Sequence, residues 1–187
     1  MSTYVADVPS QRIQTPISPD DSRPYVTLTF AQSIDAKIAG KGGKQLALSG
    51  KESLVMTHWM RTMHDAIMVG IGTALNDDPQ LNKTQQWAER KTALETAGAT
   101  VVEVAGQDGR VSIGDLLLTF RKLGIRSLMV EGGATVIQSF LDGASRDPKS
   151  SFIDSVIVTI APTFVGAGAV GYDANITDPT PLLDIYT

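Results

Sequence analysis

The chain has 187 residues, of which 42% are hydrophobic and 19% charged, and this suits one globular domain with a buried core. Its net charge is −4 without any block of lysine and arginine, so we expect no nucleic-acid partner. It has no cysteine, only two histidines (His58 and His64, both expected to be structural) and no apolar run near the roughly 20 residues of a membrane span, so neither a metal site nor a membrane segment is expected.

Residues 1–23 are polar, contain three prolines and show no hydrophobic period. They are therefore predicted to form an extended arm or a disordered tail. This stretch also lacks the basic-then-apolar layout of a secretion signal, and we expect a cytoplasmic location. Residues 24–187 are predicted to form the single domain.

The first regular elements follow this arm. Alternating β-formers predict a strand at 25–30, and a glycine-rich turn occupies 40–43. Ser49 and Glu52 have the spacing of a capping box, which predicts a helix start. That helix carries its apolar residues on one face, namely Val55, Met56, Trp59, Met60 and Met63. A second strand is predicted at 66–69.

The second half of the chain alternates between helices and strands. Strands are expected at 100–104, 127–130 and 153–160, and helices at 84–97, 113–123 and 134–141. This alternation is typical of an α/β sandwich with a largely parallel sheet. However, no strand separates the short helix that ends at 77–79 from the helix that begins at Thr84, where a doubly wound sheet would have one.

The most specific motif lies at 67–79. A buried strand runs through Gly70 and Gly72 into a short helix that carries Thr73 and, one turn later, Asp77. A strand that ends in Gly-x-Gly at a helix start gathers backbone N–H groups at one point, where an anion or a nucleotide can bind. For the glycines alone, a tight turn with an ordinary cap is the alternative.

A second strand-to-helix turn of this kind lies at 128–136. Glu131 ends the strand, Gly132 and Gly133 form the turn, and a helix begins at Ala134. Free N–H groups at such a helix start favour an anion, typically the pyrophosphate of a cofactor. The alternative is a simple corner with a solvated glutamate. Two such turns in one small domain favour a dinucleotide site.

Four further side chains are candidates for ligand contacts. Arg61 lies off the apolar face of its helix and suits a phosphate clamp, because a guanidinium can form paired hydrogen bonds with phosphate. Lys37 and Lys44 border the glycine-rich turn and are candidates for the same role. Asp35 follows a strand and either orients a polar group of a substrate or caps a turn. Each of these residues has a surface or structural role as its alternative.

The motifs form an ordered set, which comprises Ser33–Ala39, Trp59-x-Arg61, Val69–Pro79, Glu131–Ala134 and Ala161-Pro162. With this set the chain resembles the riboflavin-biosynthesis pyrimidine reductases, whose fold is related to that of dihydrofolate reductase. Residues 45–53 and 57–62 are most similar to the stand-alone fungal members. The resemblance covers roughly residues 23–171 and implies a dihydrofolate-reductase-like three-layer α/β/α sandwich with a mostly parallel central sheet.

The resemblance implies an NADPH-dependent reduction of 2,5-diamino-6-ribosylamino-4(3H)-pyrimidinone 5′-phosphate to its ribitylamino form. NADH stays open as the cofactor, because no basic pair for a 2′-phosphate stands out. The family's cofactor contacts fall on both turns, at Thr73, Asp77, Gly132, Gly133, Ala134, Thr135 and Val136. Its substrate contacts fall on Lys44, Arg61, Leu81 and Glu131. Glu131 or Asp35 is expected to be catalytic, by stabilising a developing cation or relaying a proton.

Two rival functions stay open at this point, a dihydrofolate reductase proper and a catalytically silent nucleotide-binding module. The chain also departs from the family's pattern. Ala36 stands where many members have glycine, and Thr84 stands where the family usually has arginine. The family carries a further strand and helix between the segments that meet near 82–83, and its last strands extend beyond the end at Thr187. We therefore expect a missing segment near 82–83.

A homodimer is also expected. Methionine and tryptophan are dense on the helix at 55–63, and an open edge of a parallel sheet is a liability that dimerisation can cover. The resemblance implies the same oligomeric state.

Overall fold

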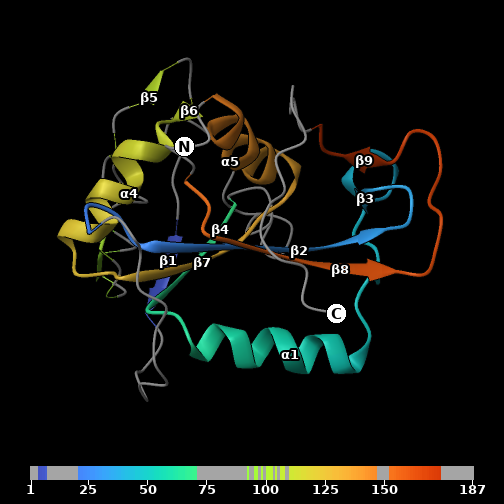
Figure 1. The fold of residues 1–187 in the computed structure, drawn as a ribbon, viewed down its shortest axis with the longest axis horizontal. Coiled ribbons are helices and arrows are strands. Elements are labelled where there is room, and N and C mark those ends of the chain that lie inside the picture. The colour runs from blue at the N-terminus through green and yellow to red at the C-terminus, as the bar shows by residue number, and fades with distance from the viewer. Residues whose placement is uncertain are drawn as a thin grey trace.

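The computed structural model describes residues 4–7, 21–70, 110–146 and 152–173, together with positions 92, 95–96, 98, 100–102, 104 and 106–107. Its main feature is a five-stranded sheet with the order β1-β4-β7-β2-β8 (Figure 1). The strands are β1 (Tyr4–Asp7), β2 (Tyr25–Ser33), β4 (Ala66–Val69), β7 (Ser127–Glu131) and β8 (Ser155–Ala161). β4, β7, β2 and β8 run parallel to one another, whereas β1 pairs antiparallel with β4.

Helices cover both faces of this sheet. α1 (Lys51–Thr62) lies along one face, and α4 (Ile113–Lys122) and α5 (Ala134–Arg146) lie together on the other (Figure 1). This arrangement confirms the expected α/β/α sandwich with a mostly parallel sheet. The short elements are β3 (Lys37–Ala39), which pairs with β9 (Val170–Gly171), and the 3-10 turn η1 (Lys41–Gly43). No helix in the described part of the chain is long and apolar enough to cross a membrane.

The larger core lies between the sheet and the layer of α4 and α5. Side chains alternate along a strand, so one half of the sheet residues faces this layer. This half comprises Val26, Leu28, Ala66, Met68, Leu128 and Val130, and the helices contribute Leu116, Leu117, Phe120, Ile137 and Phe140. The alternate residues face the α1 layer and include the polar side chains of Thr27, Thr29 and Glu131 besides the buried Met129.

Both ends of α4 carry cap motifs. At its start, the hydroxyl of Ser112 accepts the backbone N–H of Asp115. At its end, Gly124 has a φ of 87° and donates its N–H to the carbonyl of Arg121, while the next N–H reaches the carbonyl of Phe120. This Schellman motif needs a residue in the left-handed region, which glycine adopts without strain. The helices predicted at 113–123 and 134–141 and the strands predicted at 25–30, 66–69, 127–130 and 153–160 are confirmed.

Tyr4–Asp7 lies within the stretch expected to be an extended arm or a disordered tail, and it forms the edge strand β1 of the main sheet. One strand prediction is wrong, because the described residues of the strand predicted at 100–104 form no strand. Val104 packs against the core, so burial without strand pairing accounts for its apolar character. A separate hairpin of β5 (Gly106–Gln107) and β6 (Arg110–Val111) follows instead.

The helices also differ in two details. The N-cap of α1 is Gly50 without a side-chain hydrogen bond, so the predicted capping box of Ser49 and Glu52 does not form. The helix begins one residue too late for it, which puts Glu52 at the second helical position instead of the third. Of the helix predicted at 84–97, positions 92, 95 and 96 are helical and the others lie outside the described residues.

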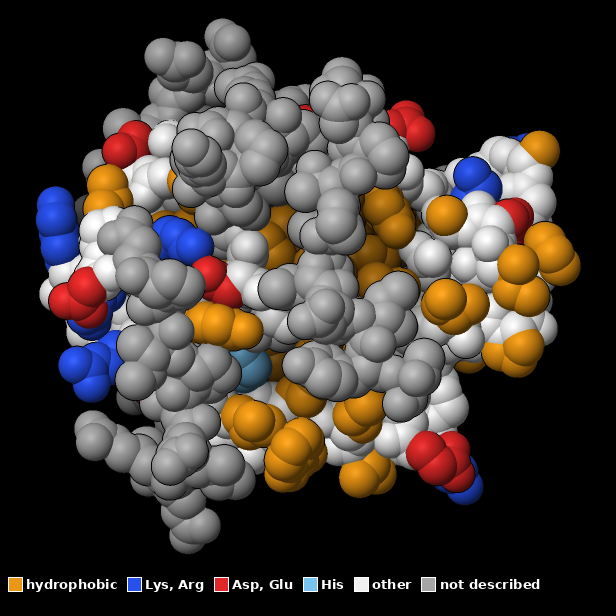
Figure 2. All heavy atoms as spheres, in the orientation of Figure 1, with side chains coloured by type: hydrophobic (Ala, Val, Ile, Leu, Met, Phe, Trp, Pro, Cys, Tyr) orange, Lys and Arg blue, Asp and Glu red, His pale blue; other side chains and the backbone are white. Residues whose placement is uncertain are grey.

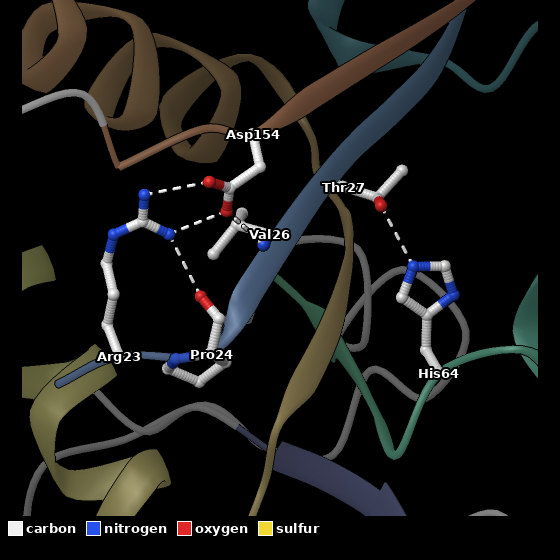
Figure 3. Close-up of polar contacts among 6 residues, drawn as sticks. All are labelled: Arg23, Pro24, Val26, Thr27, His64 and Asp154. Carbon is white, nitrogen blue, oxygen red and sulfur yellow. Dashed lines mark hydrogen bonds and ion pairs between the residues drawn. The ribbon is translucent and has the colours of Figure 1, made fainter. Parts of the chain in front are cut away.

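At the edge where the parallel strands begin, the buried carboxylate of Asp154 and the half-buried carboxylate of Asp65 hold the chain together. Arg23 precedes β2 and donates two hydrogen bonds to Asp154, which precedes β8, at 2.6 and 2.9 Å (Figure 3). Asp154 also accepts the backbone N–H of Val26 at 2.7 Å. In the same way, Asp65 before β4 accepts the N–H groups at the start of β7. These contacts fix the starts of the parallel strands. The opposite edge of the sheet, where these strands end, is thereby available for a binding site.

His64 is buried between α1 and the sheet. Its Nδ1 lies 2.8 Å from the carbonyl oxygen of Met60, and its Nε2 lies 2.9 Å from the hydroxyl of Thr27 (Figure 3). A carbonyl can only accept, so Nδ1 carries the proton and Nε2 accepts from Thr27. Burial lowers the pKa of His64 below its ordinary value of 6.5. The expectation of a structural histidine fits this environment.

This burial predicts an acid-sensitive fold. Between the lowered pKa of His64 and 6.5 the unfolded chain binds a proton that the folded chain does not, so stability falls as the pH drops below 6.5. The loss amounts to at most about 1.4 kcal/mol per pH unit for one group. Urea unfolding at pH 7.5 and 5.5 should show a smaller pH dependence in His64→Gln than in the unmodified protein. Equal pH dependence in both proteins would contradict the prediction.

Candidate functional site

The carboxyl-terminal edge of the sheet holds the turn that the sequence singled out. β7 ends at Glu131, and α5 begins at Ala134 directly after the two glycines. A Cβ added to Gly132 would lie 2.7 Å from the Cβ and 2.8 Å from the Cγ1 of Val136. Real Cβ atoms do not approach this closely, so only glycine lets the strand turn so tightly into the helix.

The start of α5 offers backbone donors to an anion. The carbonyl of Gly133 accepts the N–H groups of Val136 and Ile137, which makes Gly133 the residue from which the helix begins. The N–H groups that precede Val136 at such a helix start have no acceptor within the helix and point out of its N-terminal end. Ala134 is half-buried, Thr135 is exposed and the Val136 side chain is packed into the core. This turn therefore fits a pyrophosphate through its backbone, while Val136 anchors the helix.

Arg61 and Glu131 form a bidentate ion pair beside this turn. Nε and Nη2 of Arg61 donate to the two carboxylate oxygens of Glu131 at 2.7 and 2.6 Å. The side chains are 35% and 20% exposed, respectively. The hydrogen bond to Glu131 raises the pKa of Arg61 above its already high ordinary value. The structure thus brings together two of the predicted substrate-binding residues, from the last turn of α1 and the end of β7.

Asp35 lies at the same edge, in the turn after β2. Its Oδ1 accepts the hydroxyl of Ser33 at 2.6 Å and the N–H of Val165, and its Oδ2 accepts the N–H of Gly166 at 2.8 Å. The bond from Ser33 and the two backbone bonds lower the pKa of Asp35 to about 2. The carboxylate therefore ties the loop after β8 to this turn, which favours its turn-capping role over a catalytic one.

Ser33 also helps to hold the turn after β2 together, and the sequence patterns did not assign it this role. It is fully buried, and its hydroxyl accepts the backbone N–H of Lys37 while donating to Asp35. The signal was present, because a serine two residues before an aspartate at a strand end is typical of side-chain-to-backbone turns.

Ala36, in the centre of this turn, has a φ of 56°. It is the one described residue other than glycine with a positive φ, and it stands where the resemblance implies a glycine. A left-handed conformation costs a residue with a Cβ roughly 1–2 kcal/mol.

Ala36→Gly is therefore expected to stabilise the fold. The relief of strain exceeds the greater flexibility of glycine in the unfolded chain, and we expect a gain of roughly 0.5–1 kcal/mol in the free energy of unfolding. Urea unfolding measures it. Ala39→Gly in β3 serves as the control and should lose stability. A loss in both variants would show that the turn carries no strain.

The remaining candidates are not joined to the Arg61–Glu131 pair by the structure. Lys44 is exposed, its carbonyl accepts the N–H of Gly40, and its ammonium contacts no charged side chain among the described residues. Thr73, Asp77 and Leu81 lie outside the described residues. β4 ends at Val69, in register with Glu131, so these two strands end at the same edge of the sheet.

Comparison with protein families agrees with this geometry. The family described as the RibD C-terminal domain matches residues 24–93 and 83–175. A 2,5-diamino-6-ribosylamino-4(3H)-pyrimidinone 5′-phosphate reductase from Debaryomyces hansenii is 37% identical over 204 residues, covering 81% of this chain and 80% of that protein. This aligned length exceeds the chain's own 187 residues, so the alignment places gaps within the chain.

Solved structures show the same fold. The structure of the Saccharomyces cerevisiae riboflavin biosynthesis reductase Rib7 superimposes with a TM-score of 0.59 at 27% identity, covering 84% of this chain and 82% of that one. Acinetobacter baumannii RibD superimposes with a TM-score of 0.63 at 23% identity, covering 82% of this chain and 50% of that one. With the fold, the glycine turn and the matches over most of its length in agreement, the chain belongs to the RibD C-terminal domain family.

Proposed function

We propose that this protein reduces 2,5-diamino-6-ribosylamino-4(3H)-pyrimidinone 5′-phosphate to its ribitylamino form in riboflavin biosynthesis, with NADPH as the reductant. The observation that carries this proposal is the bidentate Arg61–Glu131 pair beside the N-terminus of α5. A guanidinium, a carboxylate and the N-terminus of a helix thereby lie at one edge of a sheet, and guanidinium groups and helix starts are both suited to binding phosphate. Relatives that match most of this chain carry the name of this reductase.

The cofactor is proposed to bind across the two glycine turns. The backbone N–H groups from Gly133 to Thr135 suit its pyrophosphate, and Gly132 keeps the helix start close to the strand end. Thr73 and Asp77 are proposed as further contacts from the resemblance. When bound, the nicotinamide group supplies the hydride. NADPH is proposed over NADH on the resemblance alone.

The substrate is proposed to bind between α1 and the end of β7. Arg61 suits the 5′-phosphate, and Glu131 suits the ribosyl group, where a carboxylate stabilises a developing cation. Lys44 and Leu81 are proposed as further substrate contacts on the resemblance. Asp35 is proposed to position the turn and loop at this edge, because a carboxyl with a pKa of about 2 is ionised near neutral pH and has no proton to donate.

The decisive experiment follows NADPH oxidation with the pyrimidine phosphate, with dihydrofolate and with neither. Oxidation with the pyrimidine phosphate alone supports the proposal. Oxidation with dihydrofolate alone would instead identify a dihydrofolate reductase. NADPH fluorescence reports whether the cofactor binds. Binding of NADPH without its oxidation in the presence of either substrate would identify a silent nucleotide-binding module.

A homodimer is proposed from the surface of α1. Val55 is 69% and Trp59 54% exposed, and Leu54 and Met56 are also exposed, whereas Met60 is buried. Figure 2 shows hydrophobic side chains gathered along the lower margin, where Figure 1 places α1. The expected apolar face of α1 therefore turns away from the core in the single chain, and a second copy would cover it.

Light scattering at micromolar concentration should give twice the chain mass, and Trp59→Glu should reduce it to the mass of one chain. A single-chain mass for the unmodified protein would refute the dimer.

We also propose that the strand and helix expected from the resemblance belong near 82–83. The family matches two segments that meet at 83–93, and the alignment to the Debaryomyces protein is longer than this chain. Sequencing the transcript across this junction tests the proposal. A transcript in which the codon of Asn82 is followed directly by the codon of Lys83 would count against the proposal.

A further inference from the structure

The ion pair between Glu131 and Arg61 occupies the groups with which each residue would bind a ligand. Both carboxylate oxygens of Glu131 accept from Arg61, at 2.7 and 2.6 Å, and the guanidinium uses its Nε–Nη2 edge for them. The third nitrogen, Nη1, lies 3.5 Å from Nδ1 of His58. The pair is only partly buried, with 35% and 20% of the two side chains exposed, so a ligand can reach it.

This pairing conflicts with a direct role for both residues in the proposed function. A carboxylate whose two oxygens each accept from one guanidinium has its charge compensated, so it stabilises a cation on a sugar less strongly than a free carboxylate does. Likewise, the Nε–Nη2 edge of Arg61, one of those that can form paired hydrogen bonds with a phosphate, is already taken. If both residues contact the substrate, the pair has to open first.

We propose that the 5′-phosphate of the substrate displaces Glu131 from Arg61 and so frees this carboxylate for the ribosyl group. This inference rests on the proposed function. A phosphate offers three oxygens and up to two negative charges, so it competes well for a guanidinium that holds a single carboxylate. The displaced carboxylate then lies next to a second anion, and this repulsion turns it away from Arg61.

The exchange makes Glu131 a specificity-determining residue. A compound with the same pyrimidine and ribose but no phosphate leaves the pair closed, and Glu131 stays neutralised. The compound without a phosphate is therefore expected to have a lower kcat as well as a higher KM. The reason is that phosphate binding helps to place Glu131 at the ribosyl group.

The first test measures the binding of inorganic phosphate by calorimetry, without substrate or cofactor. Glu131→Gln removes the internal competitor, so this variant should bind phosphate about tenfold more tightly than the unmodified protein. Arg61→Gln should bind it at least tenfold more weakly than the unmodified protein. Asp115→Asn is the matched control, because it removes one carboxylate charge from α4 on the opposite face of the sheet, and it should bind like the unmodified protein. Circular dichroism checks that each variant is folded.

The outcomes separate this inference from the proposed function. Equal or weaker phosphate binding in Glu131→Gln would overturn the exchange, since Glu131 would then support Arg61 and not compete for its ligand. Tighter binding in Asp115→Asn as well would overturn it too, by showing a general charge effect. In a second test, phosphite should accelerate reduction of the phosphate-free ribosylaminopyrimidine by the unmodified protein and not by Arg61→Gln. Reduction of the phosphorylated substrate without any phosphite effect would leave the proposed function intact and refute the exchange.

Discussion

Asp154→Ala is expected to lower the free energy of unfolding by about 3–5 kcal/mol, the usual cost of removing one partner of a buried ion pair. The side chain of Asp154 is only 8% exposed. It accepts two hydrogen bonds from Arg23 and one from the backbone N–H of Val26, so alanine would remove the acceptor of three hydrogen bonds at the start of β2 (Figure 3). Urea unfolding at pH 7.5 measures the loss.

The exposed pair of Arg121 and Asp21 provides the matched control. Asp21 is 94% exposed, and such pairs contribute about 0–1 kcal/mol. Asp21→Ala should therefore change stability little. Similar losses of unfolding free energy in Asp21→Ala and Asp154→Ala would contradict the prediction. They would show that burial does not determine the contribution of the Arg23–Asp154 pair.

Periodic patterns predicted the layers of this fold because burial enforces them. In the helix predicted at 113–123, the apolar residues Leu116, Leu117 and Phe120 recur at helical spacing, and all three lie in the core. In the strand predicted at 127–130, Leu128, Met129 and Val130 are all buried, because both faces of a parallel sheet are covered. Gly124 marked the end of α4 through a local backbone requirement. Each of these signals is contained within a few neighbouring residues.

Long-range choices were beyond the reach of these local patterns. Nothing in Tyr4–Asp7 indicates that it pairs with β4, because four residues carry too little periodicity. The apolar face of α1 looks like a core face in the sequence, whereas Val55 and Trp59 are exposed. Similarly, the sequence indicated Arg61 and Glu131 separately, but they are 70 positions apart and only the fold shows that they bind each other.

Gly132→Ala is expected to weaken cofactor binding at least tenfold. The added Cβ would lie 2.7 Å from the Cβ of Val136, which no side-chain rotation can move, so the first turn of α5 has to shift. A displacement of the backbone donors by a fraction of an ångström to 1 Å costs about ten- to hundredfold in function. Overpacking also lowers the free energy of unfolding by about 1–3 kcal/mol. NADPH fluorescence titration and urea unfolding measure the two effects.

Gly143→Ala separates these effects, because it overpacks the same helix at its other end. Its added Cβ would lie 2.7 Å from Cδ2 of Phe152, as close as the contact at Gly132. Part of that cost is offset by the better helix propensity of alanine, by about 1 kcal/mol. Gly143→Ala should therefore lose some stability and keep its affinity for NADPH, since the start of α5 stays in place. Unchanged affinity in Gly132→Ala would remove the start of α5 from the cofactor site. Equal loss of affinity in both variants would assign the effect to a loosened helix and not to displaced backbone donors.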